Sequence, residues 1–151
     1  MEYRNISRWV KISTPSIYKK VIQLEEKGLI NSVTVKEGKM PEKAVYSLTE
    51  AGEQQFEKLM MEIAGKPIHI FLDFNAVIVN LDSLPADKQR SCLANIEENV
   101  ANLKSYLQEN ILAKENVPEI PETGMAVLHQ QLILAQAIET WITSVKARLE
   151  N

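Results

Sequence analysis

Several features are scarce in this 151-residue chain, and each scarcity excludes a class of protein. The single cysteine, Cys92, excludes an internal disulfide and suits the reducing cytoplasm, so we expect a cytoplasmic protein in which this thiol packs among apolar neighbours. No run approaches the roughly 20 apolar residues of a membrane span, because polar side chains interrupt even the apolar stretch at 68–81. No charged-then-apolar start suggests a signal peptide. The sequence therefore predicts a soluble protein without membrane contact.

Catalytic and metal-binding patterns are also missing. The two histidines, His69 and His129, are far apart, and no Cys or His cluster has the spacing of metal ligands. The five glycines are scattered, and none belongs to a phosphate-binding loop. No serine, cysteine or carboxylate pair lies in a motif with a catalytic role. We therefore expect a non-enzyme that uses no metal and no cofactor.

The pattern that is present occupies residues 13–49. A capping hydroxyl and Pro15 suit the start of a helix, and Gly28 lies where a helix end favours a left-handed residue. Two short β segments follow, at 32–36 and 44–48, with a basic turn between them. Helix, strand, basic turn and strand in this order are typical of a winged helix, which indicates DNA binding.

Three short motifs in this segment occur in a characteristic order and spacing. They are Pro-Ser-Ile-Tyr at 15–18, Leu-Glu-Glu-Lys-Gly-Leu-Ile at 24–30, and Tyr-Ser-Leu-Thr at 46–49 followed by Gly52. Together they resemble the PadR family of bacterial winged-helix regulators, over about the first third of the chain. Members of that family usually begin with a further helix, of which residues 1–9 could supply only the end. The resemblance therefore implies a regulator that is either truncated or re-started at this end, with one apolar side of the helix after Pro15 exposed unless another segment or chain covers it.

The net charge of −3 hides a basic head on an acidic body. Residues 1–48 hold nine Lys or Arg against five Glu, a net charge of +4, whereas residues 49–151 hold eight against fifteen acids, a net charge of −7. This segregation is expected if only the head meets DNA phosphate. The alternative is that these cations form an ordinary solvated surface.

Two stripes divide the helix that follows Pro15. An apolar stripe at every third or fourth residue from Ile17 to Leu24 is expected in the core, and a polar stripe that includes Gln23 is left to face a major groove. Gln23 can form two hydrogen bonds with adenine, whereas lysines attract phosphate. The resemblance adds Tyr18, for which the alternative is a half-buried core tyrosine, and Ile22 fits neither stripe. The predicted DNA-binding residues are Ser13, Thr14, Ser16, Tyr18, Lys19, Lys20, Gln23, Lys27, Lys36, Lys39 and Lys43.

The rest of the chain is expected to be helical. A helix capped by Thr49 should run to about Ala64, and the Gly-Lys-Pro that follows marks a boundary between a winged-helix DNA-binding domain, 1–65, and a helical dimerisation domain, 66–151. Further helices are predicted at about 70–81, 86–113 and 125–149. The fold class is therefore mainly α with a small β-wing, a winged helix-turn-helix domain followed by a C-terminal helical dimerisation domain.

The last two predicted helices have apolar stripes wider than a lone helix pair needs, so we expect a second copy to cover the surplus in a homodimer. The alternative is a monomeric helical bundle. The predicted dimerisation residues are Val127, Leu128, Gln131, Leu134, Ile138, Trp141, Ile142 and Val145. Apolar space between the head and these helices would suit a small, flat apolar effector. The candidate lining residues are Trp9, Phe71, Phe74 and Trp141, for which the alternative is plain core.

Two functions of different classes follow. The first is a dimeric transcriptional regulator of the PadR type, a repressor, which binds a pseudo-palindromic operator on double-stranded DNA and is released by an effector. The second is a winged-helix protein-interaction module that docks an acidic protein and has no specific DNA binding. Sequence-dependent duplex binding with a steep salt dependence distinguishes the two. Regulators of the MarR type usually build their dimer from both chain ends, whereas here the spare helical material lies after the wing.

Overall fold

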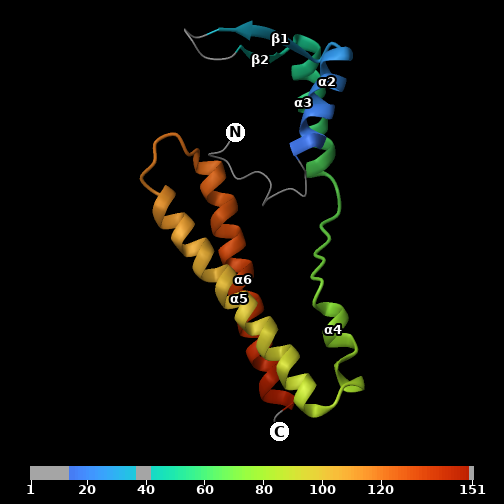
Figure 1. Cartoon of the computed structure of the whole chain (residues 1–151), viewed down its shortest axis with the longest axis vertical. Coiled ribbons are helices and arrows are strands. Elements are labelled where there is room, and N and C mark those ends of the chain that lie inside the picture. The colour runs from blue at the N-terminus through green and yellow to red at the C-terminus, as the bar shows by residue number, and fades with distance from the viewer. Residues whose placement is uncertain (1–13, 37–41, 150–151) are drawn as a thin grey trace. The chain divides into compact units, whose positions relative to one another are not determined.

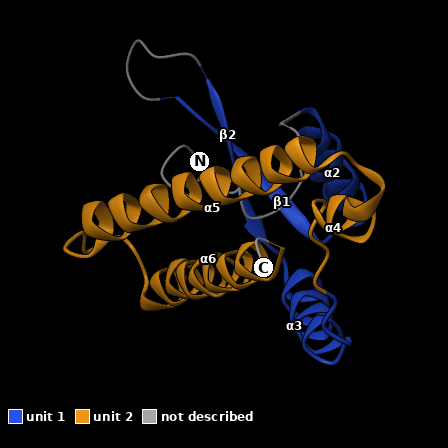
Figure 2. Ribbon diagram, turned by 90° about the horizontal axis from the view of Figure 1, so that it is seen from below, with its two compact units in different colours: residues 1–69 blue, residues 70–151 orange. Residues whose placement is uncertain are grey.

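The structure, a computed structural model, describes residues 14–36 and 42–149. It divides into two compact units, residues 1–69 and 70–151, which Figure 2 colours separately and which are described one at a time. The prediction of a mainly α fold with a small β-wing is confirmed. The elements, labelled in Figure 1, are α2 (Thr14–Glu26), β1 (Ile30–Val35), β2 (Lys43–Leu48), α3 (Glu50–Ala64), α4 (Asn75–Val79), the 3-10 turn η2 (Leu81–Ser83), α5 (Ala86–Lys114) and α6 (Glu122–Leu149).

Helix α2 ends at a glycine, as predicted. Gly28 has a φ of 68°, and its N–H donates to the carbonyl of Glu25 at 2.8 Å. The N–H of Leu29 donates to the carbonyl of Leu24 at 2.9 Å. These two bonds form a Schellman closure, which satisfies carbonyls that the helix leaves unpaired and requires a left-handed residue. Glycine adopts that conformation without the steric penalty of a Cβ.

The wing is a two-stranded antiparallel sheet that places Ile30 opposite Leu48 and Val35 opposite Lys43. A hydrogen bond from the Ser32 hydroxyl to the Glu25 carboxylate ties β1 to α2. Among the described residues of this unit, Ile30 is the only buried apolar side chain.

The apolar stripe of α2 is less covered than a core stripe would be. Ile17 and Val21 are half-buried, while Leu24 is exposed. The sequence-based assignment of this stripe to the core is therefore met only in part. Residues 1–9, where only the end of a preceding helix was expected, lie outside the described residues.

The Thr49 hydroxyl joins the end of α2 to the start of α3. Its Oγ1 donates to the carbonyl of Gly28 at 2.7 Å and accepts from the N–H of Gly52 at 3.1 Å. The backbone N–H of Thr49 donates to the carbonyl of Leu29 at 3.1 Å. Thr49 therefore caps α3, as predicted, and also fixes the end of β2 against the turn that follows α2.

Gly52 explains the glycine of the third motif. It is buried, and a Cβ built on it would lie 1.9 Å from the carbonyl oxygen of Leu29. No side chain fits at that distance, so the first turn of α3 can approach the turn after α2 only with glycine at this position. The spacing from Thr49 to Gly52 thus serves capping and close packing together.

The second unit is built on α5 and α6, which run side by side in opposite directions (Figure 1). Their starts and ends lie within about three residues of the predicted ones. Two buried apolar clusters lie along the pair. One contains Leu81, Leu93, Ile96, Val100 and Ile142, and the other contains Leu107, Leu128 and Ala135.

Two ion pairs also join the long helices. Lys104 Nζ bonds both carboxylate oxygens of Glu139, and Lys146 Nζ bonds Glu97. Each pair links one residue of α5 with one residue of α6, so the two pairs favour the same register of the helices as the apolar clusters do.

The helix predicted at 70–81 is largely wrong. Regular helix covers only Asn75–Val79, without a side-chain cap at its N-terminus, and a 3-10 turn follows. The Asn80 side chain donates to the carbonyl of Ala76 at 2.7 Å, an interaction with which asparagine competes against helix continuation. The apolar spacing in this segment instead marks the side chains that hold it against α5 and α6, because Phe74, Val77 and Ile78 pack against the cluster that contains Ile142.

The close approach at Gly52 gives a first prediction. Gly52→Ala should lower the free energy of unfolding of the first unit by about 1–3 kcal/mol, because the new methyl group must displace the Leu29 carbonyl. The control is Gly65→Ala, where a built Cβ lies 3.5 Å from its nearest neighbour, the Met61 carbonyl oxygen. Thermal unfolding followed by far-UV circular dichroism measures both. Equal midpoints for the two variants would contradict the prediction.

Candidate nucleic-acid interface

Helix α2 presents a broad exposed surface. Tyr18 is 69% exposed, so the alternative of a half-buried core tyrosine is wrong. Gln23 is half-buried. From Pro15 to Leu24 the helix carries two lysines and no carboxylate, so the local field favours an anion. The other predicted DNA-binding residues with exposed side chains here are Ser16, Lys19 and Lys20 on α2 and Lys27 in the turn after it.

The wing contributes two further exposed lysines. Lys36 directly follows β1 and Lys43 begins β2, so the strand register places both at the same end of the hairpin. Lys36 lies 3.6 Å from a carboxylate oxygen of Glu42, with both side chains well exposed. Such surface pairs contribute little, so Lys36 can exchange this partner for phosphate. Ser13, Lys39 and the side chain of Thr14 lie outside what the structure describes.

Charge is segregated within the first unit. Helix α3 carries four glutamates and one lysine, Lys58, in contrast to the cationic first ten residues of α2. A polyanion would therefore be attracted to α2 and the wing and repelled by α3.

Sequence reasoning gave no role to Ile22, which is 55% exposed on α2. It lies one turn after Tyr18 and three residues after Lys19, so the three side chains share one side of the helix. The signal was present in the helical projection, which places position 22 away from the half-buried Ile17 and Val21.

The second unit corrects part of the predicted dimer surface. Leu128 is 3% and Ile142 0% exposed, because both are buried in the clusters between α5 and α6. They have no surface left for a second chain, so their assignment as direct dimer contacts is wrong. The remaining predicted residues divide into exposed ones, Leu134 and Trp141, and half-buried ones, Val127, Gln131, Ile138 and Val145.

Ile133, 64% exposed on α6, is a surface residue that the predicted dimer set omitted. The sequence carries the signal, because Leu-Ile-Leu-Ala at 132–135 covers more than one side of a helix and one of these residues must face outward. Leu134, the next residue, is exposed as well, so two adjacent apolar side chains of α6 face outward.

Two of the four aromatic residues considered for an effector site meet in the structure. The rings of Phe74 and Trp141 stack with centroids 5.8 Å apart and an interplanar angle of 25°. Phe74 packs against the cluster that contains Ile142, while Trp141 stays exposed. Phe71 is exposed, and Trp9 lies outside the described residues.

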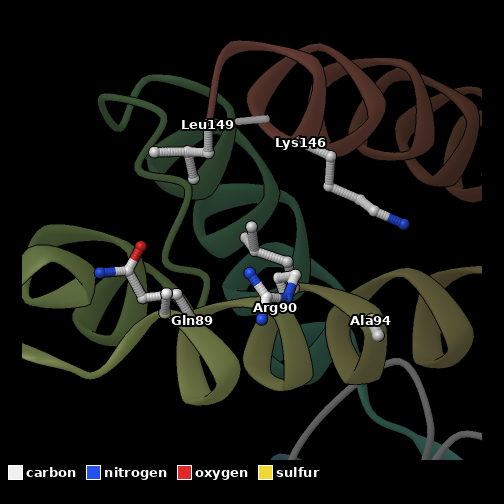
Figure 3. Close-up of a pocket in the computed structure, with 7 residues that line it drawn as sticks. Gln89, Arg90, Ala94, Lys146 and Leu149 are labelled. Atoms are coloured by element: carbon white, nitrogen blue, oxygen red, sulfur yellow. The ribbon is translucent and has the colours of Figure 1, made fainter. Parts of the chain in front are cut away.

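A separate hollow of about 480 Å³ lies between the first turns of α5 and the last turns of α6 (Figure 3). None of the four aromatic residues lines it. Its polar groups are partly engaged, since Lys146 pairs with Glu97 and the Gln89 amide donates to the carbonyl of Leu84 at 2.8 Å. The lining residues are Ala86, Gln89, Arg90, Leu93, Ala94, Lys146 and Leu149.

Two other features are absent from residues 14–36 and 42–149. Within these ranges no three His, Cys, Asp or Glu side chains gather as metal ligands. No helix there combines the length and the apolar character needed to cross a membrane.

The segment that contains α2 and the wing resembles a known protein family. The sequence profile of the transcriptional regulator PadR-like family matches residues 4–58. Residues 4–58 are therefore similar to the PadR-like family. The match takes in α2, the wing and the first half of α3, so it contains the Schellman turn and the Thr49 contacts. A search of curated proteins finds no match.

Solved structures of PadR-like and other regulators are similar to this chain over most of its length. Bacillus subtilis PadR in complex with operator DNA has a TM-score of 0.79 at 20% identity, covering 91% of this chain and 79% of that one. The Vibrio cholerae virulence activator AphA has a TM-score of 0.68 at 24% sequence identity, and the match covers 96% of this chain and 82% of that one. A PadR-like transcriptional regulator from Bacillus cereus has a TM-score of 0.73 at 16% sequence identity, and the match covers 98% of this chain and 84% of that one. The chain therefore has the fold of PadR-like regulators.

The division of α6 between core and surface gives a second prediction. Ile142→Ala should lower the free energy of unfolding of the second unit by about 2–5 kcal/mol, because it leaves a cavity among fully buried side chains. Ile133→Ala, a matched change on the exposed side of the same helix, should have little effect at low protein concentration. Urea unfolding followed by circular dichroism compares them, and similar losses would show that the assignment of the buried side is wrong.

Proposed function

We propose that the chain is a transcriptional regulator, without enzymatic activity, that binds double-stranded DNA through α2 and the wing. The observation that carries the proposal is the exposed surface of α2 from Pro15 to Leu24, cationic and without a carboxylate, within a PadR-like domain. The presence of operator DNA in the Bacillus subtilis PadR structure supports the same use of the fold here.

The proposed DNA contacts are of two chemical kinds. Gln23 can pair with adenine in the major groove, and lysines of α2 and the wing neutralise phosphates on either side. The N-terminal end of α2 is the positive end of its helix dipole, which also favours a phosphate. The residues proposed for phosphate and groove contacts are Ser13, Thr14, Ser16, Tyr18, Lys19, Lys20, Lys27, Lys36, Lys39 and Lys43.

We propose further that two copies pair through the second unit. The exposed apolar side chains of α6, Ile133, Leu134 and Trp141, are the surface that supports this pairing. A two-fold dimer would present two α2 helices to a pseudo-palindromic operator with half-sites about one helical turn apart.

Repression in the cytoplasm is the proposed outcome, because two heads on one operator would exclude polymerase from overlapping promoter DNA. A flat apolar effector stacked on the exposed Trp141 would release the operator by changing the spacing of the two heads. The Phe74–Trp141 stack supports this site, because it offers an aromatic surface that is partly open.

Fluorescence anisotropy tests the function directly. The chain is titrated with its own upstream promoter duplex and with a scrambled duplex of the same length, at several salt concentrations. Preference for the promoter with a steep salt slope supports the proposal. Weak, equal binding to both duplexes contradicts it and favours the protein-interaction module.

Two variants on α2 give the third prediction. Lys20→Ala should weaken binding to every duplex and reduce the slope of log K against log salt by about 1, because one phosphate contact is lost. Gln23→Ala should leave the slope unchanged and weaken only the promoter duplex, by roughly 5- to 150-fold. Lys58→Ala, on α3, is the control and should change neither property. The same slope for all three variants would contradict the placement of Lys20.

Self-association gives the fourth prediction. Leu134→Glu should shift the sedimentation equilibrium toward monomer, because a carboxylate would be buried against an apolar surface. Gln130→Glu places the same charge on another exposed position of α6 and should leave the equilibrium unchanged. A monomeric wild type, or dimers of equal strength in both variants, would contradict the proposed pairing.

A further inference from the structure

Ile22 is an unusual surface residue for helix α2. It is a large aliphatic side chain, 55% exposed, and it belongs to neither of the buried clusters of the structure. An isolated exposed apolar residue needs no explanation, but Ile22 lies beside a second one, since Tyr18 is one turn away and also exposed.

The surroundings of Ile22 restrict what can cover it. Lys19 is three residues earlier on the same side of the helix, and Lys20 follows it directly. The carboxylates of α2 come only at its end, where Glu25 is bonded to Ser32 and Glu26 lies one turn beyond Ile22. A partner that covers this surface must therefore bring negative charge to the lysines and an apolar group to Ile22 at the same time.

Duplex DNA meets both requirements in its major groove. Phosphates line the edges of the groove, and the C5 methyl of each thymine is the apolar group exposed on its floor. We propose that Ile22 is a specificity-determining residue that contacts a thymine C5 methyl in each operator half-site. This inference rests on the proposed function, because it takes α2 as the helix that enters the groove.

Ile22 and Gln23 then have complementary tasks. Gln23 can recognise the adenine of an A·T pair by hydrogen bonds, and Ile22 can recognise the methyl group of a nearby thymine by exclusion of water. Neither task adds a charge contact, so both select sequence without changing the salt slope.

Replacement of thymine by deoxyuridine removes only the methyl group and tests this contact. A duplex is first selected by the wild-type chain from a randomised pool, and each of its thymines is then replaced singly. At one position in each half-site the wild type should lose about fourfold in affinity, the value of one buried methyl-sized group. Ile22→Ala should bind the unmodified duplex about fourfold more weakly and show no further loss at that position.

Two more variants make the result specific. Ile22→Val keeps a branched aliphatic group and should retain the sensitivity to deoxyuridine. Ile63→Ala removes an exposed isoleucine from α3 and should behave as wild type. Circular dichroism should show the same thermal midpoint for Ile22→Ala and wild type, since the side chain is exposed.

The outcomes separate this inference from the proposed function. A wild type that selects and binds a duplex, but loses affinity at the same uridines and to the same extent as Ile22→Ala, overturns the role of Ile22 and leaves the regulator standing. A wild type that selects no sequence from the pool overturns the proposed function, and the role of Ile22 with it.

Discussion

The Thr49 hydroxyl is the contact on which the geometry of the first unit depends. It donates to the Gly28 carbonyl in the turn after α2 and accepts from the Gly52 N–H in the first turn of α3, while the backbone N–H of the same residue donates to the Leu29 carbonyl. Only Ile30 supplies a buried apolar side chain among the unit's described residues, so hydrophobic packing alone does not define the angle between helix and wing. Short polar bonds and the close approach at Gly52 define it instead. Loss of either would remove one of the contacts that hold the end of β2 against the turn after α2.

The second unit depends on a different force. Its long helices bury two apolar clusters, and the largest fully buried side chains of the described residues, Leu107 and Ile142, lie in them. Apolar burial is non-directional, so it does not by itself select one register of the two helices. The ion pairs between α5 and α6 are partly exposed and individually weak, yet each fits only one register. Packing therefore supplies stability, and the charges add specificity.

Local chemistry decided which parts of the fold were predictable. Helix ends at Gly28 and Thr49 follow from residues within one turn of each end, and the sequence placed both correctly. The helix predicted at 70–81 failed because apolar spacing reports which side chains are anchored, and not whether the backbone between them is helical. Leu128 and Ile142 were misassigned for a related reason. An apolar stripe shows that something covers a helix, but a helix of the same chain and a second copy leave the same pattern.

The candidate site was also only partly predictable from the spacing of its residues. Exposure separated Tyr18 from the core and brought out Ile22, because spacing alone cannot show where the rest of the unit lies. The described residues of α2, the turn after it and the wing include five lysines, Lys36 pairs with Glu42, and residues 49–151 carry a net charge of −7. Few phosphate contacts on an acidic body give weak non-specific binding. Under the proposed function, affinity for an operator would then come from base contacts and from two heads bound together, whose joint occupancy would multiply small preferences. Under these conditions the uncharged contact proposed for Ile22 would contribute a larger share of sequence recognition than it would beside a denser lysine surface.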